Sequence, residues 1–483
     1  LVADLKSGRL TDEEAYRYIH SLWTMIENRR TTVNGRIIVG GKGRKHPKEA
    51  DVFLHIAMKV AKNCRYVEPQ FTLRFDKDTS EEIWDEALDA LGAGATYPTL
   101  YNDDVNVPAV MYGMRVDEKA AEQYVPFGCT EFVIQGQSTG TPNICINLLK
   151  LLTIYMNDGI DPIDGKRKSG PVPLKKLEEY QTFEEFYDGY KALLDYYLDL
   201  SVKAQYHSYE VMNQHVSFLF TSLLTDDCIA RGKALLDGGV RYLGGTNETY
   251  GNINTSDSLW VIRDLVFNQK KYTLRQLNDA MLANFNGYEA LRKDCLNCDK
   301  YGNDLETADT MANDLYEFVA KGVRDRGIAI GMQYFLIVIS NNQLNTEWGN
   351  RTAASPDGRL SYMYMNPANN PQGGANKSGP TAMLNSLAKF DAKYHGGSVQ
   401  NIKFSPSMFN ENRAVIKSLF KTYFAKGGCH LMVTVVDKGV LEDAVEHPEN
   451  YPDLIVRVSG FSAVFVDLSP NIQQELLSRV LYD

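Results

Sequence analysis

Helical segments alternate with short apolar runs along most of this 483-residue chain, and that alternation limits its fold more than any other feature. Thr11 followed by Glu14 forms a capping box that opens the first helical segment, where apolar residues recur on one stripe. Residues 51–65 are also helical in pattern, whereas residues 66–75 and 335–339 have the length and composition of strands. The alternation predicts an α/β fold.

Further elements follow the same rules. Three short apolar segments are predicted as strands: residues 91–100, 110–114 and 124–127. Long helices are predicted over three segments: residues 183–200, 277–291 and 309–322. Glycine pairs such as Gly244 and Gly245 are predicted as turns between helices. A strand is expected over residues 431–436, and Ser469 with Pro470 is expected to open the last helix.

Charge and hydrophobicity exclude several classes of partner. The net charge is −10, which argues against binding to nucleic acid and against attraction to an anionic membrane surface. No apolar run approaches the roughly 18 to 20 residues that a membrane helix needs. Seven scattered cysteines, an odd number, are typical of reduced thiols in the cytoplasm. The first residues carry neither Met nor a signal-peptide pattern, so we expect the numbering to begin within a longer polypeptide.

Metal ligands have little support in this sequence. Cys295 and Cys298 form one CxxC pair, but a structural zinc site needs a second pair, so surface thiols are the favoured interpretation. The eight histidines form no HxxxH or HxH pair. We therefore expect no bound metal.

A polar segment between Gly349 and Pro380 is rich in Gly, Pro, Asn and Ser and has no periodicity. So long a segment in a compact chain is either a functional loop or a disordered one.

A thiol and a carboxyl group occur two residues apart at Cys129 and Glu131, between Phe127 and Phe132. In an extended segment their side chains would face one cavity, where burial raises the pKa of a carboxyl group toward that of a general base at neutral pH. The alternative is a buried cysteine beside an exposed glutamate. A thiolate hydrolase would also need a histidine in reach, for which His215 and His430 have no particular support.

The segment from Arg457 to Leu468 surrounds Gly460 with apolar residues. A hairpin tip explains the glycine, because glycine adopts positive φ without cost. A second interpretation is that the Cα itself reacts, since only a residue without Cβ flattens freely into a delocalised carbon radical.

The segment Arg457-Val-Ser-Gly-Phe-Ser-Ala-Val-Phe-Val-Asp-Leu closely resembles the C-terminal signature of glycyl radical enzymes, and Phe127-Gly-Cys-Thr-Glu131 resembles their cysteine loop. Similarity extends through Leu100-Tyr-Asn-Asp-Asp, Gly379-Pro-Thr-Ala and Phe404-Ser-Pro-Ser-Met408, and so covers nearly the whole chain from about Asn34. Members of this family are longer at the N-terminus.

The resemblance implies a ten-stranded α/β barrel of two antiparallel five-stranded halves, with the cysteine and glycine loops meeting at its centre. Residues 1–395 would form the catalytic barrel with the cysteine loop, and residues 396–483 the C-terminal glycyl radical domain. Part of the first half-barrel would lie outside this chain. A homodimer is expected by the same analogy.

The resemblance also implies the chemistry. A separate radical-S-adenosylmethionine activase would leave a radical on Gly460, which would take hydrogen from Cys129, and the Cys129 thiyl would take hydrogen from a small-molecule substrate. Glu131 would act as general base while a neighbouring group leaves. The family supplies reactivity through the radical, and the protein supplies position and dryness.

The cysteine loop favours elimination over acyl transfer. Ketoacid formate-lyases carry two adjacent cysteines, whereas residue 128 is glycine here. The Cys-x-Glu arrangement resembles that of dehydratases and other C–X lyases, and arylacetate decarboxylases share it. Diol dehydratases have an Asp about a dozen residues after the glutamate, where this chain has Asn143, which accepts or donates a hydrogen bond but takes no proton.

Two further alternatives stay open. Arg74, at the end of a predicted strand, is a candidate for binding an anionic substrate, although a surface salt bridge is the commoner role. A non-catalytic homologue with a retained barrel would also carry these motifs.

Overall fold

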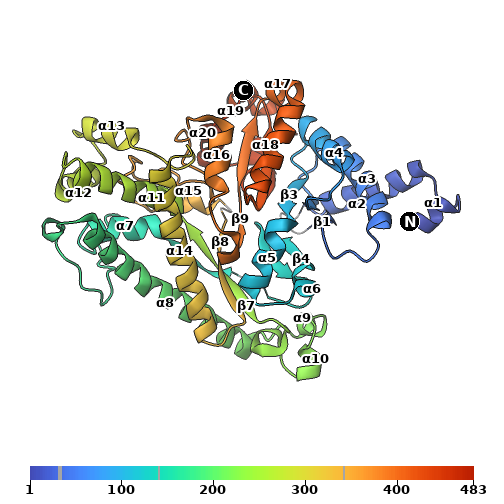
Figure 1. The fold of residues 1–483 in the computed structure, drawn as a ribbon, viewed down its shortest axis with the longest axis horizontal. Helices are drawn as coiled ribbons and strands as arrows, with labels where there is room; N and C mark the ends of the chain where they lie inside the picture. The colour runs from blue at the N-terminus through green and yellow to red at the C-terminus, as the bar shows by residue number, and fades with distance from the viewer. Residues whose placement is uncertain (31–34, 140–141, 341–342) are drawn as a thin grey trace.

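The computed structural model describes residues 1–30, 35–139, 142–340 and 343–483 and confirms an α/β fold (Figure 1). Its strands are β1 (Arg36–Gly40), β2 (Gln70–Phe75), β3 (Thr99–Asn102), β4 (Tyr124–Phe127), β5 (Glu131–Ile134), β6 (Pro142–Asn147), β7 (Gly244–Tyr250), β8 (Tyr334–Ile339), β9 (His395–Ser398), β10 (Asn401–Phe404), β11 (His430–Val435), β12 (Ile455–Arg457) and β13 (Ser462–Val464). The longer helices are α2 (Asp12–Glu27), α3 (Pro47–Asn63), α4 (Glu81–Gly92), α5 (Asp103–Met114), α7 (Leu148–Met156), α8 (Phe183–His215), α11 (Asn252–Val261), α12 (Leu274–Leu282), α13 (Glu289–Asn297), α14 (Glu306–Ala329), α16 (Gly379–Leu387), α18 (Arg413–Ala425), α19 (Lys438–Glu446) and α20 (Pro470–Ser478).

The larger strands form two sheets. In the five-stranded sheet, with the order β1-β2-β3-β11-β10, the first three strands are parallel, the last two are parallel, and β11 runs antiparallel to β3. The strands of the four-stranded sheet, β6-β7-β8-β9, are all parallel. Parallel strands need crossover connections, which explains why helices separate most of them in sequence.

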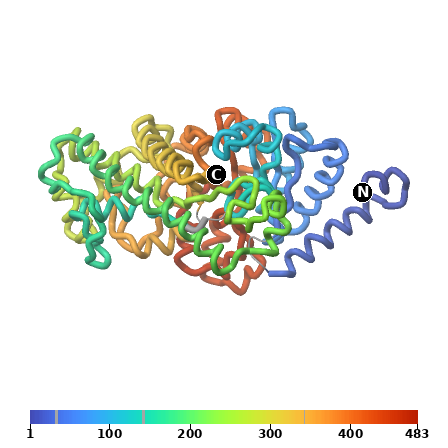
Figure 2. The backbone as a smooth tube through the Cα atoms, turned by 90° about the horizontal axis from the view of Figure 1, so that it is seen from below, coloured from blue at the N-terminus to red at the C-terminus, as the bar shows by residue number. Residues whose placement is uncertain are grey.

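Helices cover the outer faces of both sheets. Helices α3 and α4 pack together on the five-stranded sheet, whereas α8 and α14 lie along the four-stranded sheet (Figure 1). The capping box at the start of α2 is present as predicted, and this helix with the short α1 (Val2–Lys6) extends to one side of the molecule (Figure 2). No described helix combines the length and apolarity that a membrane crossing requires.

Two β-hairpins lie between the sheets. Strands β4 and β5 form one hairpin, whose second strand contacts β9, and β12 with β13 forms the other, which contacts β11. Each hairpin has its own small apolar cluster, around Phe132 and Phe465 respectively, apart from the main core. The sheets therefore act as a frame that presents two hairpin tips to each other.

Several sequence predictions about elements are wrong. Residues 110–114 belong to α5 rather than to a strand, because a helix buried on most sides carries the same apolar run. Only Thr99 and Leu100 of the segment 91–100 lie in a strand, and residues 277–291 divide between α12 and α13. Gly244 and Gly245 begin β7 instead of forming a turn. A Cβ on Gly244 would lie 2.2 Å from the Tyr334 ring, so the glycine permits close strand packing.

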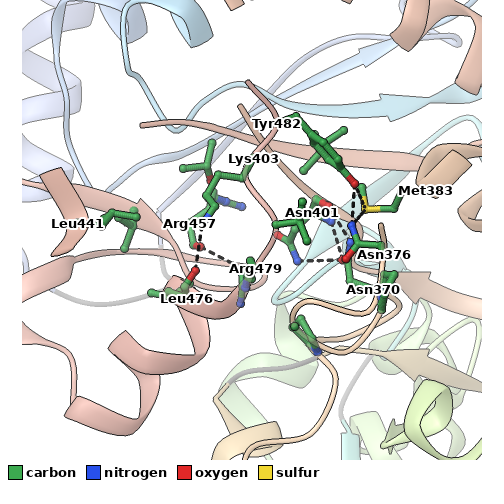
Figure 3. A pocket seen from close by; sticks show the side chains of 17 residues that line it. Asn370, Asn376, Met383, Asn401, Lys403, Leu441, Arg457, Leu476, Arg479 and Tyr482 are labelled. Atoms are coloured by element: carbon green, nitrogen blue, oxygen red, sulfur yellow. Dashed lines mark hydrogen bonds between the residues drawn. The ribbon is translucent and has the colours of Figure 1, made fainter. Parts of the chain in front are cut away.

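The polar segment from Gly349 to Pro380 is largely buried, which contradicts disorder. Asn370 donates to the backbone carbonyl of Asn401 (2.7 Å), and Asn376 donates to the hydroxyl of Tyr482 (2.7 Å), as Figure 3 shows. The segment is therefore tied both to β10 and to the end of the chain.

The Asn102 side chain connects β3 to the segment before β11, at the place where the five-stranded sheet changes strand direction. Its side-chain oxygen accepts from the Asp104 N–H and caps α5, while its amide donates to the carbonyls of Phe424 (3.1 Å) and Gly428 (3.0 Å) ahead of β11. We expect Asn102→Ala to lower the free energy of unfolding by about 2–4 kcal/mol in urea titrations, because it removes a cap and a donor to two buried carbonyls. Thr182→Ala, which removes only the exposed cap of α8, should cost about 1 kcal/mol. Equal losses in the two variants would contradict this role.

Candidate active site

The cysteine loop is the tight turn of the β4–β5 hairpin. Gly128 has φ +53° and Thr130 has φ +111°, so Cys129 sits at a turn and not in the extended segment that the sequence suggested. A Cβ on Gly128 would lie 2.6 Å from Oε2 of Glu131. A side chain at position 128 would therefore strain the backbone and would require the Glu131 carboxyl group to move.

The glycine loop is the tip of the β12–β13 hairpin, where Gly460 has φ +81°. A Cβ placed on Gly460 would lie 2.6 Å from Cβ, 2.7 Å from Sγ and 2.8 Å from Cα of Cys129. Both residues are buried. The structure thus brings Gly460 and Cys129 into direct contact, and only a residue without a side chain fits at position 460.

Burial keeps the Cys129 thiol protonated. Its pKa rises well above the ordinary value because the group is desolvated and because Glu131 and Glu248 add negative charge nearby. Hydrogen-atom transfer needs an intact S–H bond, whereas a hydrolase needs a thiolate. His430 is buried and its pKa is lowered well below the ordinary value by desolvation and by nearby Arg457, while His215 is exposed at the end of α8. The hydrolase alternative therefore gains no support.

Glu131 begins β5 and is 4% exposed, which rules out the exposed-glutamate alternative. Desolvation raises the pKa of its carboxyl group to about 8, against hydrogen bonds from backbone N–H groups. Its Oε2 has no hydrogen-bond partner in the described protein. The Glu131 carboxyl group is thus buried, has a pKa close to neutral pH, and has one oxygen available to accept a proton.

Two guanidinium groups lie beside these loops. Arg36 of β1 donates from Nη2 to the Gly128 carbonyl (2.5 Å) and to Gln70, and its charge lowers the pKa of Glu131. Arg457 of β12 donates to Ser462 Oγ (3.0 Å) and lies over the Tyr97 ring. Within the described residues, neither forms a salt bridge with a carboxylate. The positive charge of Arg36 therefore acts on the nearby carboxyl group of Glu131 from a distance and not through a direct ion pair.

Among the residues that the structure describes, several buried polar side-chain atoms on the surrounding elements have no hydrogen-bond partner, so the interior around the loops is polar. Each such atom costs about 1–3 kcal/mol unless a ligand or water pairs with it. They include Gln70 Nε2, Tyr101 Oη, Thr130 Oγ1, Ser398 Oγ, Gln400 Oε1, His430 Nε2, Arg457 Nε and Ser459 Oγ.

The other residues that the sequence analysis discussed lie in different surroundings. Arg74 is buried and forms a two-pronged ion pair with Asp103 (2.9 and 2.7 Å) and a hydrogen bond to the Tyr124 carbonyl (2.9 Å), so its salt bridge is internal and holds β4. The Asn143 side chain lies outside the described residues, although its backbone belongs to β6. Cys295 is fully buried on α13 and Cys298 half-buried, which corrects the interpretation as surface thiols.

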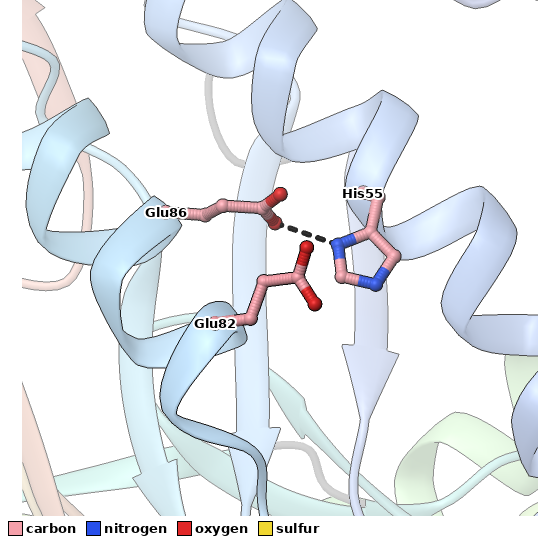
Figure 4. Close-up of side chains that lie close together, drawn as sticks. All are labelled: His55, Glu82 and Glu86. Atoms are coloured by element: carbon pink, nitrogen blue, oxygen red, sulfur yellow. Dashed lines mark hydrogen bonds and ion pairs between the residues drawn. The ribbon is translucent and has the colours of Figure 1, made fainter.

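A possible metal-binding group lies elsewhere. His55 of α3 and two glutamates of α4, Glu82 and Glu86, have ligand atoms within 4.8 Å of one another (Figure 4). His55 Nδ1 is 2.8 Å from Glu86 Oε2. The three side chains lie on the outer helices and take no part in the site around Cys129.

Comparisons with known proteins agree with this geometry. Residues 1–344 match the family model described as Pyruvate formate lyase-like, and residues 365–466 match the one described as Glycine radical. The chain belongs to the pyruvate formate lyase-like family, and it carries that family's glycine radical domain.

The relatives include dehydratases and lyases. Trans-4-hydroxy-L-proline dehydratase of Clostridioides difficile is 28% identical, over 99% of this chain and 62% of that protein. Isethionate sulfite-lyase of Oleidesulfovibrio alaskensis is 26% identical, over 99% of this chain and 60% of that protein. The glycerol-bound B12-independent glycerol dehydratase of Clostridium butyricum matches with a TM-score of 0.88 at 28% identity, over 98% of this chain and 62% of that one. The chain thus spans less than two thirds of these relatives' length.

Sequence reasoning missed Arg36 and Glu248. Arg36 lies in β1, a segment in which the sequence singled out no site residue, and Glu248 lies in Gly-Gly-Thr-Asn-Glu-Thr-Tyr, a strand whose glycines were predicted as a turn. The sequence did contain one indication of Glu248. If residues 244–250 are taken as a strand, alternation places Thr246, Glu248 and Tyr250 on the same face.

The raised pKa of Glu131 predicts a pH-dependent stability. Because its folded pKa is about 8, its contribution is complete below the ordinary carboxyl pKa and is lost as pH rises through 8. Glu131→Gln should therefore be more stable than the wild type at pH 9, with the gain vanishing near pH 4, in urea titrations across that range. Glu178→Gln, at an exposed carboxyl whose pKa Arg275 lowers, should show no alkaline gain. A pH-independent difference for Glu131→Gln would contradict the assignment.

Proposed function

We propose that this chain is the catalytic part of a glycyl radical lyase that removes a group, such as a hydroxyl, from a small polar substrate. The contact between Gly460 and Cys129 in a buried polar interior supports this most strongly. The names of the relatives, which include dehydratases and a sulfite-lyase, point to the same class of reaction.

In the proposed reaction, a separate radical-S-adenosylmethionine activase first removes hydrogen from the Gly460 Cα. Gly460 then takes hydrogen from Cys129, and Cys129 takes hydrogen from a substrate carbon. Glu131 accepts the proton of the substrate hydroxyl as the neighbouring group departs, and Cys129 returns the hydrogen. The proton held by Glu131 passes to the departed hydroxide, so that water is released and the carboxylate is restored. A carboxyl group with a pKa of about 8 suits this acceptance of a proton near neutral pH.

The cysteine loop disfavours a ketoacid formate-lyase. Such an enzyme would carry a second thiol next to Cys129, and position 128 has positive φ and no space beside Glu131. Arylacetate decarboxylation requires no second thiol, but no observation favours it over elimination.

Other features of the proposal follow from family membership. We infer that the two sheets correspond to the halves of a ten-stranded barrel, with residues 396–483 as the radical domain, although β11 of that segment pairs with β3 as well as with β10. A homodimer, a cytoplasmic location and strictly anaerobic activity are part of the same proposal. Asn143 is proposed as a substrate contact, whereas the ion pair of Arg74 with Asp103 favours a structural role.

Electron paramagnetic resonance tests the proposal. After anaerobic treatment with a radical-S-adenosylmethionine activase, the wild type should give a doublet from the single Cα hydrogen of Gly460, and Gly460→Ala should give none. Cys129→Ser should retain the doublet and lose turnover of glycerol, isethionate or trans-4-hydroxy-L-proline. A wild-type chain without a doublet under a competent activase would favour a non-catalytic homologue instead.

A further inference from the structure

The guanidinium group of Arg36 joins the five-stranded sheet to the cysteine loop. Arg36 on β1 pairs in register with Gln70 on β2, so the two side chains lie on the same face of the sheet. Its Nη2 donates to Oε1 of Gln70 and to the carbonyl of Gly128 (2.5 Å). Because a guanidinium group only donates, Gln70 presents its oxygen to Arg36. One side chain is thus bound both to the sheet and to the residue before Cys129.

The cysteine loop depends on contacts from outside its own hairpin. A backbone hydrogen bond from the Thr130 N–H to the Phe127 carbonyl (3.0 Å) closes the turn. Thr130 nevertheless has a positive φ of 111°, a conformation that costs about 1–3 kcal/mol and persists only where the surroundings hold it. Among the described side chains, that of Arg36 donates to the Gly128 carbonyl at this turn. The contact therefore helps to fix the position of the Cys129 thiol.

The same guanidinium group acts on the carboxyl group of Glu131. A Cβ on Gly128 would lie 2.6 Å from Oε2 of Glu131, so the residue whose carbonyl Arg36 binds is next to that carboxyl group. Desolvation raises the pKa of Glu131 to about 8, the charge of Glu248 adds to the rise, and the charge of Arg36 opposes it.

Other titratable or charged groups near the loop come from several elements. They are Cys129 itself, Tyr101 of β3, Glu248 of β7, His395 of β9, His430 of β11 and Arg457 of β12. Desolvation keeps the thiol and the phenol protonated and both imidazole groups uncharged near neutral pH. The positive charge that favours the ionised form of Glu131 comes from Arg36.

The proposed reaction requires Glu131 in its ionised form, because only the carboxylate takes the proton of the substrate hydroxyl. A carboxyl group with a pKa of about 8 is mainly protonated at pH 7, and each further unit of pKa lowers the ionised fraction about tenfold. A direct ion pair would occupy the carboxylate oxygen that must accept the proton. Arg36 is instead bound to Gln70 and Gly128, and Oε2 of Glu131 has no partner in the described protein.

We propose that Arg36 is a positioning residue of the active site, a proposal that rests on the function proposed above. Its hydrogen bond to the Gly128 carbonyl holds the cysteine loop in place, and its charge favours the carboxylate form of Glu131 that accepts the proton. The role uses two properties of a guanidinium group, the fixed fork of donors and the permanent charge.

Substitutions of Arg36 separate these two properties. Arg36→Gln retains a donor without the charge, so Glu131 should ionise only at higher pH. We expect kcat/KM of the activated full chain for glycerol or trans-4-hydroxy-L-proline to fall about tenfold at pH 7 and to recover as pH rises toward 9. Arg36→Lys retains the charge without the fork and should keep the wild-type pH profile at a lower rate. A merely structural role would lower the rate of Arg36→Gln equally at every pH.

Infrared titration of the full chain without activation measures the protonation of Glu131 independently of turnover. The carboxyl band that Glu131→Gln lacks should disappear with a midpoint of about 8 in the wild type and at higher pH in Arg36→Gln. Arg65→Gln is a matched control, because Arg65 also donates to a backbone carbonyl, that of Ala93 (2.8 Å), but is exposed on the outside of the molecule. It should change neither the midpoint nor the pH profile.

The outcomes distinguish this proposal from the proposed function. An unchanged Glu131 midpoint in Arg36→Gln, or a pH profile parallel to that of the wild type, would overturn the role of Arg36 alone. If Arg36→Gln does not fold, Gln70→Leu decides the question, since it removes the acceptor that orients Arg36: an unchanged midpoint and rate there would overturn the proposal. A wild-type chain that forms the Gly460 doublet but eliminates no probe would overturn hydroxyl elimination, and the catalytic role of Arg36 with it, whatever the midpoint.

Discussion

The contact between Gly460 and Cys129 is the constraint on which the rest of the structure depends. The hydrogen transfer proposed between the two residues requires that they lie in contact, and a Cβ at position 460 would fall within 3 Å of three Cys129 atoms. The two residues are distant in sequence, and each lies at the tip of a short hairpin that is too small to be stable alone. The two sheets supply the frame that holds these tips together, and the surrounding side chains exclude water from them.

Burial of this contact also determines the electrostatics of the site. Desolvation keeps the thiol of Cys129 protonated and moves the pKa of Glu131 toward neutrality. Arg36 limits the second effect, since its charge favours the ionised carboxylate. Glu248 acts in the other direction, because its negative charge adds to the raised pKa of both Cys129 and Glu131.

The sequence was most informative where a motif depends on local backbone geometry. Gly460 and Cys129 stood out because glycine between apolar strands and a thiol beside a carboxyl group are each unusual, and similarity to a known family joined them. Burial of Glu131 could be inferred from its aromatic neighbours. Arg36 and Glu248 could not be found in this way, because their importance comes from strands that meet only in three dimensions. The same limit explains residues 110–114, where apolar composition alone does not separate a buried helix from a strand.

Gly128 has an evolutionary consequence. Its positive φ and its contact with Glu131 mean that the backbone turn which accommodates the carboxylate leaves no space for a neighbouring sulfur atom. A single replacement by cysteine would strain the turn and displace the glutamate together. The presence of this carboxylate and the absence of a second thiol at position 128 are therefore coupled through one turn, so that a change at either residue affects the other.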